Sequence, residues 1–134
     1  MREILFRGKR VDNGELVYGW LCRVGDKYAN IVEKYTEVLC SVSTKTIGQH
    51  TGLTDKNGKK SFEGDIIKIV PDYDYSDDYS ISKVYSYNGV FCVDYHGDDF
   101  DSTALGFLED YLPDGDFEVI GNIYDNPELL EVAK

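Results

Sequence analysis

The sequence is short of positive charge. It has 14 Lys and Arg against 25 Asp and Glu, a formal net charge of −11 over 134 residues. A protein that binds nucleic acid or an anionic membrane without specificity needs a surplus of cations to neutralise phosphates. This composition therefore excludes both as general roles, and we expect no membrane partner and no nucleic-acid partner.

Paired cysteines and a long apolar run at the N-terminus are also missing. Cys22, Cys40 and Cys92 are widely spaced with no CxxC pair, which leaves no zinc or thioredoxin-like site. Their apolar and β-branched neighbours predict buried, reduced thiols. The N-terminal apolar run, Ile4–Phe6, is too short for a signal peptide or a membrane span. A cytoplasmic location is expected.

Signatures of the common catalytic sites do not occur in the sequence. There is no P-loop, no GxGxxG, no GxSxG and no HExxH motif. We therefore expect no catalytic residue and no cofactor, and favour a protein that is not an enzyme.

Three Asn-Gly pairs divide the chain and predict β-hairpins, because both residues tolerate the positive φ that tight hairpin turns require. They are Asn13-Gly14, Asn57-Gly58 and Asn88-Gly89. The segments on either side of these pairs are predicted to be strands. Further strands are predicted at Asp65–Val70, Val38–Val42 and Phe117–Ile120. The predicted fold is mainly β, a hairpin-rich small barrel or a pair of packed sheets, with one or two short helices. An α+β fold is the alternative.

Helix is predicted in two places. Residues 102–110 have Ser102 as a potential N-cap and leucines on one side, although Gly106 weakens this pattern. At the C-terminal end, Asn126 and Pro127 precede ELLEVAK, which is typical of a helix start. A single domain over residues 1–134 is expected, with an acidic, flexible segment at 72–83.

Negative charge gathers in the middle of the chain. Residues 72–116 have 12 acidic residues and one basic residue, Lys83, whereas residues 1–71 have 12 basic and 9 acidic residues. One hypothesis is that these carboxylates mimic nucleic acid and bind a host DNA-binding protein. The candidate acidic surface comprises Asp72, Asp74, Asp77, Asp78, Asp98, Asp99 and Asp101.

A weaker alternative is a metal-dependent hydrolase. His96 lies in a short stretch with Asp94, Asp98, Asp99 and Asp101, and His with Asp is a mixture that binds divalent metals and lowers the pKa of a bound water. His96, Asp98 and Asp99 are its candidate ligands. A strand-end turn explains the same residues, so no metal is expected.

The segment Gly48–Ile69, GQHTGLTDKNGKKSFEGDIIKI, resembles the YopX family, small proteins of bacteriophages and prophages of Gram-positive bacteria. The opening, Met1–Arg7, and the ending, Val119–Leu130, fit the family pattern too. His50 stands where the family has Tyr, which argues against His50 as the base of a shared reaction. The resemblance implies a phage-encoded protein of the host bacterial cytoplasm that is β-rich and self-associating, and it implies no reaction.

The motif has a structural and a functional interpretation. Structurally, Asn57-Gly58 forms a hairpin and Asp65 hydrogen-bonds local backbone at a strand entrance. Functionally, the motif presents a polar interaction surface to a partner. The candidate residues of that surface are Thr51, Asp55, Lys56, Asn57, Glu63 and Asp65.

The function we favour is a non-enzymatic phage accessory protein that binds a host or phage protein and forms a homo-oligomer. The first hairpin supplies an apolar surface for another copy of the chain, through Val17, Trp20 and Leu21. Because each copy is acidic, added salt should tighten such an association.

Overall fold

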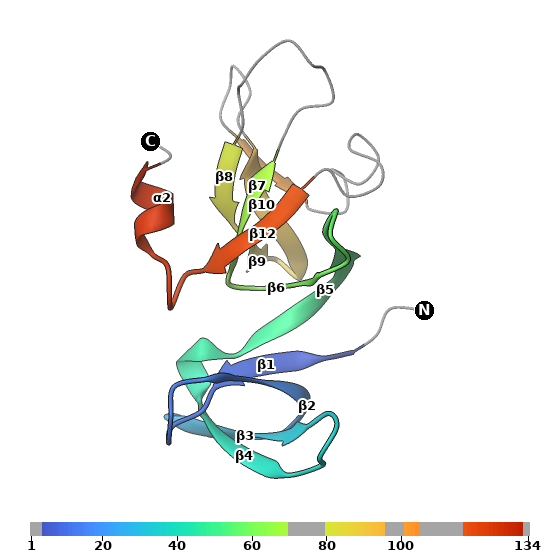
Figure 1. Cartoon of the computed structure of the whole chain (residues 1–134), viewed down its shortest axis with the longest axis vertical. Coiled ribbons are helices and arrows are strands. Elements are labelled where there is room, and N and C mark those ends of the chain that lie inside the picture. Colours follow the sequence, from blue (N-terminus) through green and yellow to red (C-terminus); the bar gives the residue numbers. More distant parts are fainter. Residues whose placement is uncertain (1–3, 70–79, 96–100, 105–116, 133–134) are drawn as a thin grey trace. The chain divides into compact units, whose positions relative to one another are not determined.

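The computed structural model describes residues 4–69, 80–95, 101–104 and 117–132 (Figure 1). The chain divides into two compact units, Met1–Gly52 and Leu53–Lys134. Each unit is built from antiparallel strands, so the mainly β prediction is confirmed. The expectation of a single domain stays a prediction.

The first unit is a curled sheet that closes on itself. Its strand order is β4-β3-β2-β1-β5. An isolated bridge joins Arg10 to Val42, and Val11 N–H donates to the Ser41 carbonyl at 3.0 Å, so the end of β1 meets β4. This unit is therefore a small barrel. Its elements are β1 (Phe6–Lys9), β2 (Leu16–Val24), β3 (Tyr28–Glu33), β4 (Leu39–Ser43), the 3-10 turn η1 (Thr44–Thr46) and β5 (Gly48–Thr54), whose last two residues belong to the second unit.

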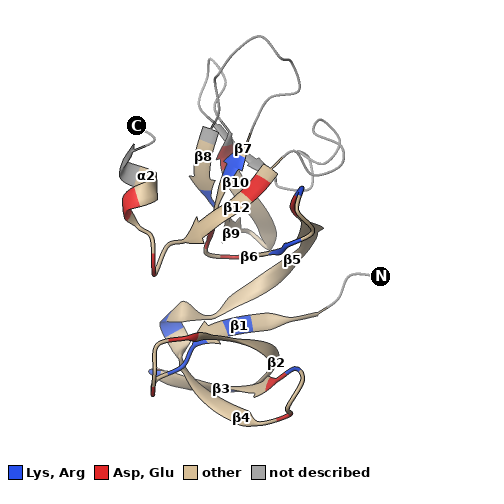
Figure 2. Ribbon diagram, viewed as in Figure 1, with Lys and Arg blue, Asp and Glu red and all other residues tan. Residues whose placement is uncertain are grey.

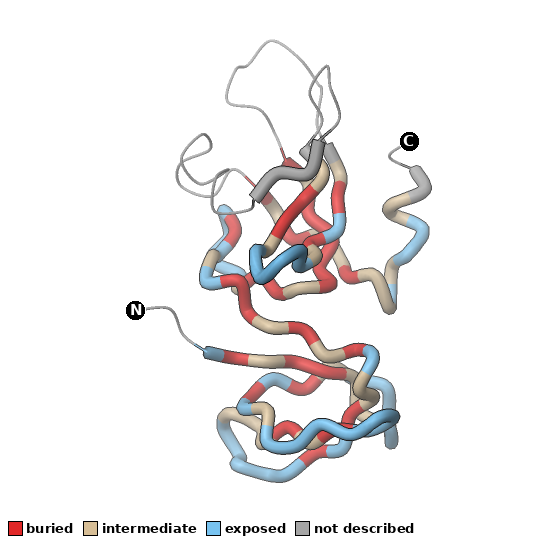
Figure 3. The backbone as a smooth tube through the Cα atoms, turned by 180° about the vertical axis from the view of Figure 1, so that it is seen from behind, coloured by how far each residue is buried: buried red, intermediate tan, exposed pale blue. Residues whose placement is uncertain are grey.

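Alternate residues of these strands fill the barrel. The core consists of Val17, Ala29, Ile31, Cys40 and Val42, with Phe6, Leu21 and Ile47 packed against it. Figure 3 shows the alternation of buried and exposed positions along the strands. Gly19 is required here, because a Cβ at that position would lie 1.8 Å from the Val32 carbonyl oxygen on β3.

The second unit has two three-stranded sheets, ordered β12-β7-β8 and β11-β10-β9. Its strand β6 neighbours the end of β5. The core contains Ile67, Ile69, Val84, Val93, Phe117 and Val119, with Leu53 and Phe91 packed against it. The elements are β6 (Lys60–Phe62), β7 (Asp65–Ile69), β8 (Ser80–Lys83), β9 (Tyr85–Tyr87), β10 (Val90–Tyr95), β11 (Asp101–Ala104), β12 (Phe117–Asn122) and α2 (Glu128–Val132).

All three Asn-Gly pairs lie in hairpin connections, as predicted. Only Asn88-Gly89 forms a two-residue turn, with φ of 51° and 80° and with Tyr87 paired to Val90. The connections at Asn13-Gly14 and Asn57-Gly58 are longer, and in each only the glycine has positive φ.

Two sequence predictions need correction. Ser102–Ala104 is not the start of a helix, because these residues pair with β10 as part of β11. Cys22 is exposed, unlike the buried Cys40 and Cys92, since alternation along β2 puts it on the outward side with Tyr18 and Trp20. The C-terminal helix is confirmed as α2. Among the described residues, no helix has the length and hydropathy to cross a membrane.

Candidate functional site

Two polar residues of the Gly48–Ile69 motif, Asp55 and Asp65, hold the fold together. Asp55 is buried, and its Oδ1 accepts the N–H groups of Asn57 at 2.9 Å and Lys59 at 2.8 Å. Its Oδ2 accepts the Val119 N–H at 2.9 Å. One carboxylate thus shapes the turn between β5 and β6 and ties that turn to β12.

Asp65 has a similar role one turn later. It is 1% exposed, and its Oδ2 accepts the Phe62 N–H at 2.7 Å, which fixes the entry into β7. The predicted local hydrogen bond of Asp65 is therefore confirmed. Such charge-assisted bonds to buried backbone groups contribute roughly 1.5–3 kcal/mol each.

The other predicted interaction residues are placed differently. Thr51 is buried in the first unit, whereas Lys56 and Asn57 are exposed at the tip of the β5–β6 turn. Lys56 Nζ lies 3.5 Å from Glu118 on β12, and Glu63 accepts a hydrogen bond from Ser86 Oγ at 2.7 Å. Of the predicted interaction residues, Lys56 and Asn57 are therefore the exposed ones, and the interaction surface itself stays a prediction.

Most of the predicted acidic surface lies outside the described residues. This holds for Asp72, Asp74, Asp77, Asp78, Asp98 and Asp99, and for His96; Asp101 is placed in β11 by its backbone only. Asp94 is described, and its Oδ1 accepts the Tyr85 hydroxyl at 2.7 Å. Within the described ranges, no cluster of three metal-ligating side chains occurs. The acidic mimic and the metal site stay predictions.

An apolar row crosses the outside of the barrel. Trp20 on β2 pairs with Val32 on β3, which in turn pairs with Leu39 on β4. These positions alternate with core residues, so their side chains point outward. Trp20 is 47% exposed and Leu39 is 57% exposed. Three apolar side chains thus lie side by side on a solvent-facing sheet surface.

The turn between β3 and β4 has two more exposed side chains. Val38 is 56% exposed, Tyr35 is 84% exposed, and the Lys34 N–H donates to the carbonyl of Tyr18, itself an exposed residue of β2. We use the name outer face for Tyr18, Trp20, Val32 and Leu39, which strand alternation and pairing place on one side of the sheet. The largest apolar patch on a monomeric protein is often functional.

Glu33 holds this turn in one conformation. Its Oε2 accepts the N–H groups of Tyr35 and Thr36 and the Thr36 hydroxyl, and its backbone N–H donates to the Val38 carbonyl at 2.8 Å. The hydrogen bonds from Thr36 lower the pKa of the Glu33 carboxyl. Glu37 completes the turn with a φ of 59°. Tyr35 is therefore displayed by an ordered turn.

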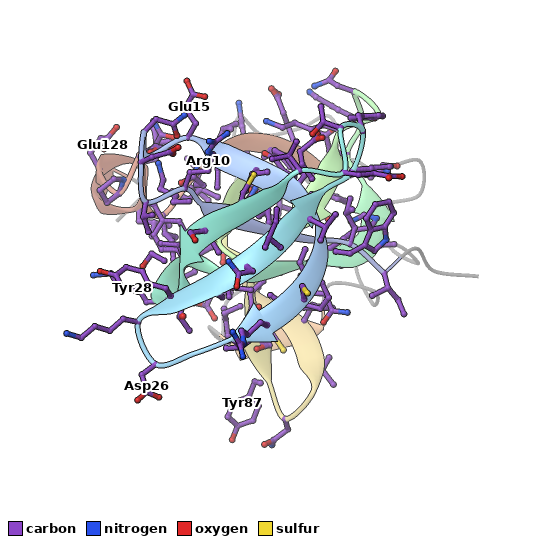
Figure 4. The ribbon with its side chains drawn as sticks, turned by 90° about the horizontal axis from the view of Figure 1, so that it is seen from below. Arg10, Glu15, Asp26, Tyr28, Tyr87 and Glu128 are labelled. Atoms are coloured by element: carbon purple, nitrogen blue, oxygen red, sulfur yellow. The ribbon has the colours of Figure 1, made fainter. Side chains whose placement is uncertain are left out.

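Of the three residues expected to form an apolar surface on the first hairpin, only Trp20 is exposed. Val17 and Leu21 belong to or pack against the barrel core. Val32, Leu39 and Tyr35 were not anticipated. The alternation in Leu39–Ser43 carries the missing signal, since Cys40 and Val42 face inward and leave Leu39 outside. Figure 4 shows two other exposed aromatics, Tyr28 near the β2–β3 turn and Tyr87 on the β9–β10 hairpin.

Comparison with known proteins identifies the family of the chain. The family model described as YopX protein matches residues 5–131. The SPbeta prophage-derived protein YopX of Bacillus subtilis strain 168 is 38% identical over 105 residues, covering 75% of this chain and 73% of that protein.

Two solved structures have a similar fold. The crystal structure of YopX from Bacillus subtilis matches with a TM-score of 0.62 and 25% identity, covering 97% of this chain and 99% of that one. Protein EF1440 from Enterococcus faecalis matches with a TM-score of 0.60 and 23% identity over the same shares of the two chains. The resemblance noted in the Gly48–Ile69 motif is confirmed, and this chain belongs to the YopX family.

Proposed function

We propose that this chain is a phage- or prophage-encoded accessory protein that works in the bacterial cytoplasm by binding protein, and not by catalysing a reaction. The observation that carries the proposal is the outer face, in which Trp20, Val32 and Leu39 form one row on paired strands. The prophage origin of the relative in Bacillus subtilis supports the biological setting.

The chemistry of the outer face suits a protein partner. Binding hot spots are enriched in Trp and Tyr, which supply large contact areas at low entropic cost. Here Trp20 and the exposed Tyr18 are both anchored on strand β2. Because these residues are already ordered on strands, binding does not include the free-energy cost of ordering them.

The test is affinity capture from a nuclease-treated lysate of a Gram-positive host, with the parent chain and three variants. Trp20→Ser and Leu39→Ser remove apolar area from the outer face. Tyr87→Ser is the matched control, because Tyr87 is 65% exposed but belongs to the second unit. We expect the same protein to be retained by the parent and by Tyr87→Ser, and lost with the other two.

Capture that is equal for all four proteins would refute the proposal that the outer face is the binding site. Salt separates the two remaining hypotheses. Apolar docking persists at high salt, whereas acidic mimicry of nucleic acid weakens steeply as salt is added.

A further inference from the structure

We propose that Asn88 is a site of spontaneous deamidation, in which the backbone nitrogen of Gly89 attacks the side chain of Asn88 and ammonia is released. The inference goes beyond the proposed function, because it concerns a covalent change in the second unit and not the binding of a partner. Three Asn-Gly pairs occur in the sequence, and asparagine is a thermally labile residue in proteins. The structure distinguishes Asn88 from Asn13 and Asn57.

The reaction needs water as its one other reactant. The nitrogen of Gly89 forms a bond to Cγ of Asn88, the bond from Cγ to Nδ2 breaks, and the proton of the nitrogen leaves with the ammonia. The product is a cyclic succinimide, and water opens it at either carbonyl carbon to give aspartate or isoaspartate. A glycine after the asparagine favours the attack at all three pairs, because it has no Cβ to obstruct the approach.

Hydrogen bonding of the attacking nitrogen differs among the three pairs, although all three are exposed to water. The Gly14 N–H donates to the Arg10 carbonyl at 2.9 Å, and the Gly58 N–H donates to the Asp55 carbonyl at 2.9 Å. A backbone N–H in such a bond gives up its proton less readily. The bond also has to break before the nitrogen can turn toward the asparagine side chain, so the turn must first open.

Further hydrogen bonds hold the first two turns. The side-chain Oδ1 of Asn13 accepts the Glu15 N–H at 2.9 Å, so attack on its Cγ requires the loss of this bond too. The backbone N–H of Asn57 donates to Oδ1 of the buried Asp55 at 2.9 Å. Both asparagines are therefore protected by turns in which several bonds break together.

The turn at Asn88-Gly89 is held only at its base, where Tyr87 pairs with Val90. Within the described part of the chain, neither the Gly89 N–H nor the Asn88 side chain makes a hydrogen bond. Strand β9 has three residues and lies at the edge of its sheet. Opening of this hairpin tip therefore breaks fewer bonds than opening of the other two turns, and it brings Cγ of Asn88 to the Gly89 nitrogen at a lower cost in free energy.

Deamidation at this position should weaken the β9–β10 hairpin. Isoaspartate adds a CH2 group to the main chain of a turn that the pairing of Tyr87 with Val90 restricts to two residues. The hairpin matters to the second unit, because β10 contributes Val93 to its core. The reaction also adds a negative charge to a unit in which residues 53–134 have 6 basic and 19 acidic residues, of which Figure 2 colours the described ones.

The test is incubation of the full-length chain at mildly alkaline pH and physiological temperature, both folded and unfolded in urea. Peptide mapping by mass spectrometry follows the deamidation of Asn13, Asn57 and Asn88. For each asparagine, the rate in urea divided by the rate in the folded chain measures the protection by the fold. We expect Asn88 to be protected about tenfold less than the other two, or less still. The isoaspartate form, separated by anion exchange, should melt at a lower temperature than the parent.

Asp55→Ala tests the physical reason for the difference. This variant loosens the turn at Asn57, so deamidation of Asn57 should accelerate while the rates at Asn88 and at Asn13 in the first unit stay unchanged. Circular dichroism checks that the variant is folded, and the comparison of the folded and unfolded parent decides the proposal if it is not.

Three outcomes would overturn the inference. The first is equal protection of all three asparagines, and the second is stronger protection of Asn88 than of Asn13 or Asn57. The third is a folded Asp55→Ala chain in which Asn57 reacts no faster than in the parent, because the hydrogen bonds of the turn would then not be the source of protection. An isoaspartate form that melts with the parent would contradict the expected effect on the hairpin.

Discussion

Replacing Asp55 with alanine removes the acceptor of three backbone N–H groups at once. The bond from Val119 is buried, so its N–H would be left without water or a partner, at a cost of about 1–3 kcal/mol. The N–H groups of Asn57 and Lys59 lie in a turn that water can reach, and each loses roughly 0.5–1 kcal/mol. Asp55→Ala should therefore lower the free energy of unfolding by roughly 2–5 kcal/mol.

Urea denaturation followed by circular dichroism measures this loss, and a shift of the midpoint by about 1–2 M is expected. Asp55→Asn separates the hydrogen bonds within the turn from the bond to β12. Its amide oxygen still accepts the N–H groups of the turn, whereas its NH2 group faces the Val119 N–H. The free energy of unfolding of this variant should therefore fall by about 1–3 kcal/mol. Asp12→Ala is the control, since Asp12 is an exposed carboxylate paired only locally with Arg10. If the midpoint of Asp55→Ala matches those of the parent and the control, Asp55 does not hold the turn against β12.

Four further predictions follow from the structure. Gly19→Ala should unfold the first unit or cost about 3 kcal/mol or more by thermal melting, because its Cβ meets the Val32 carbonyl; Gly14→Ala, whose Cβ meets nothing within 4 Å, should lose only about 1 kcal/mol, and equal losses would contradict this. Glu37→Gly should raise stability by up to about 1 kcal/mol, since the φ of 59° suits glycine; a lower melting temperature would argue against strain there. The Glu33 pKa is lowered, so its hydrogen bonds stabilise the β3–β4 turn above the ordinary Glu pKa and are lost as the pH falls through the lowered value. The protection of the Tyr35 and Thr36 amides from exchange, relative to their intrinsic exchange rates at each pH, should fall over that window in the parent but show no such step in Glu33→Gln. Added salt should tighten self-association by screening the net charge of −11, and a mass by light scattering that falls with salt would contradict this.

Local signals predicted the elements of the fold well, and long-range pairing explains the errors. The hairpin at Asn88-Gly89 and the helix after Asn126-Pro127 were both predicted correctly, because turns and helix starts depend on residues that are close together in sequence. Ser102–Ala104 has the marks of a helix start, yet pairing with β10 decides its state. Cys22 has apolar neighbours in sequence, but the side of β2 that faces the core is set by the strands packed around it, and Cys22 lies on the other side.

The candidate site shows the same division. Trp20 was singled out from the sequence, whereas Val32 and Leu39 join it only because β2, β3 and β4 pair in one register. Asp55 and Asp65 were predicted as part of a polar interaction surface. In the structure both carboxylates are buried, and both accept hydrogen bonds from backbone N–H groups.

The sequence by itself determined the family, the β-rich class, the turns and the uneven charge, because these depend on residue types and short spacings. Tertiary structure alone decided which motif carboxylates are buried, where the barrel closes and which apolar side chains stay outside. The physical reason is that burial and register depend on partners far away in the chain: Val119 lies 64 residues from Asp55, and Leu39 lies two strands from Trp20.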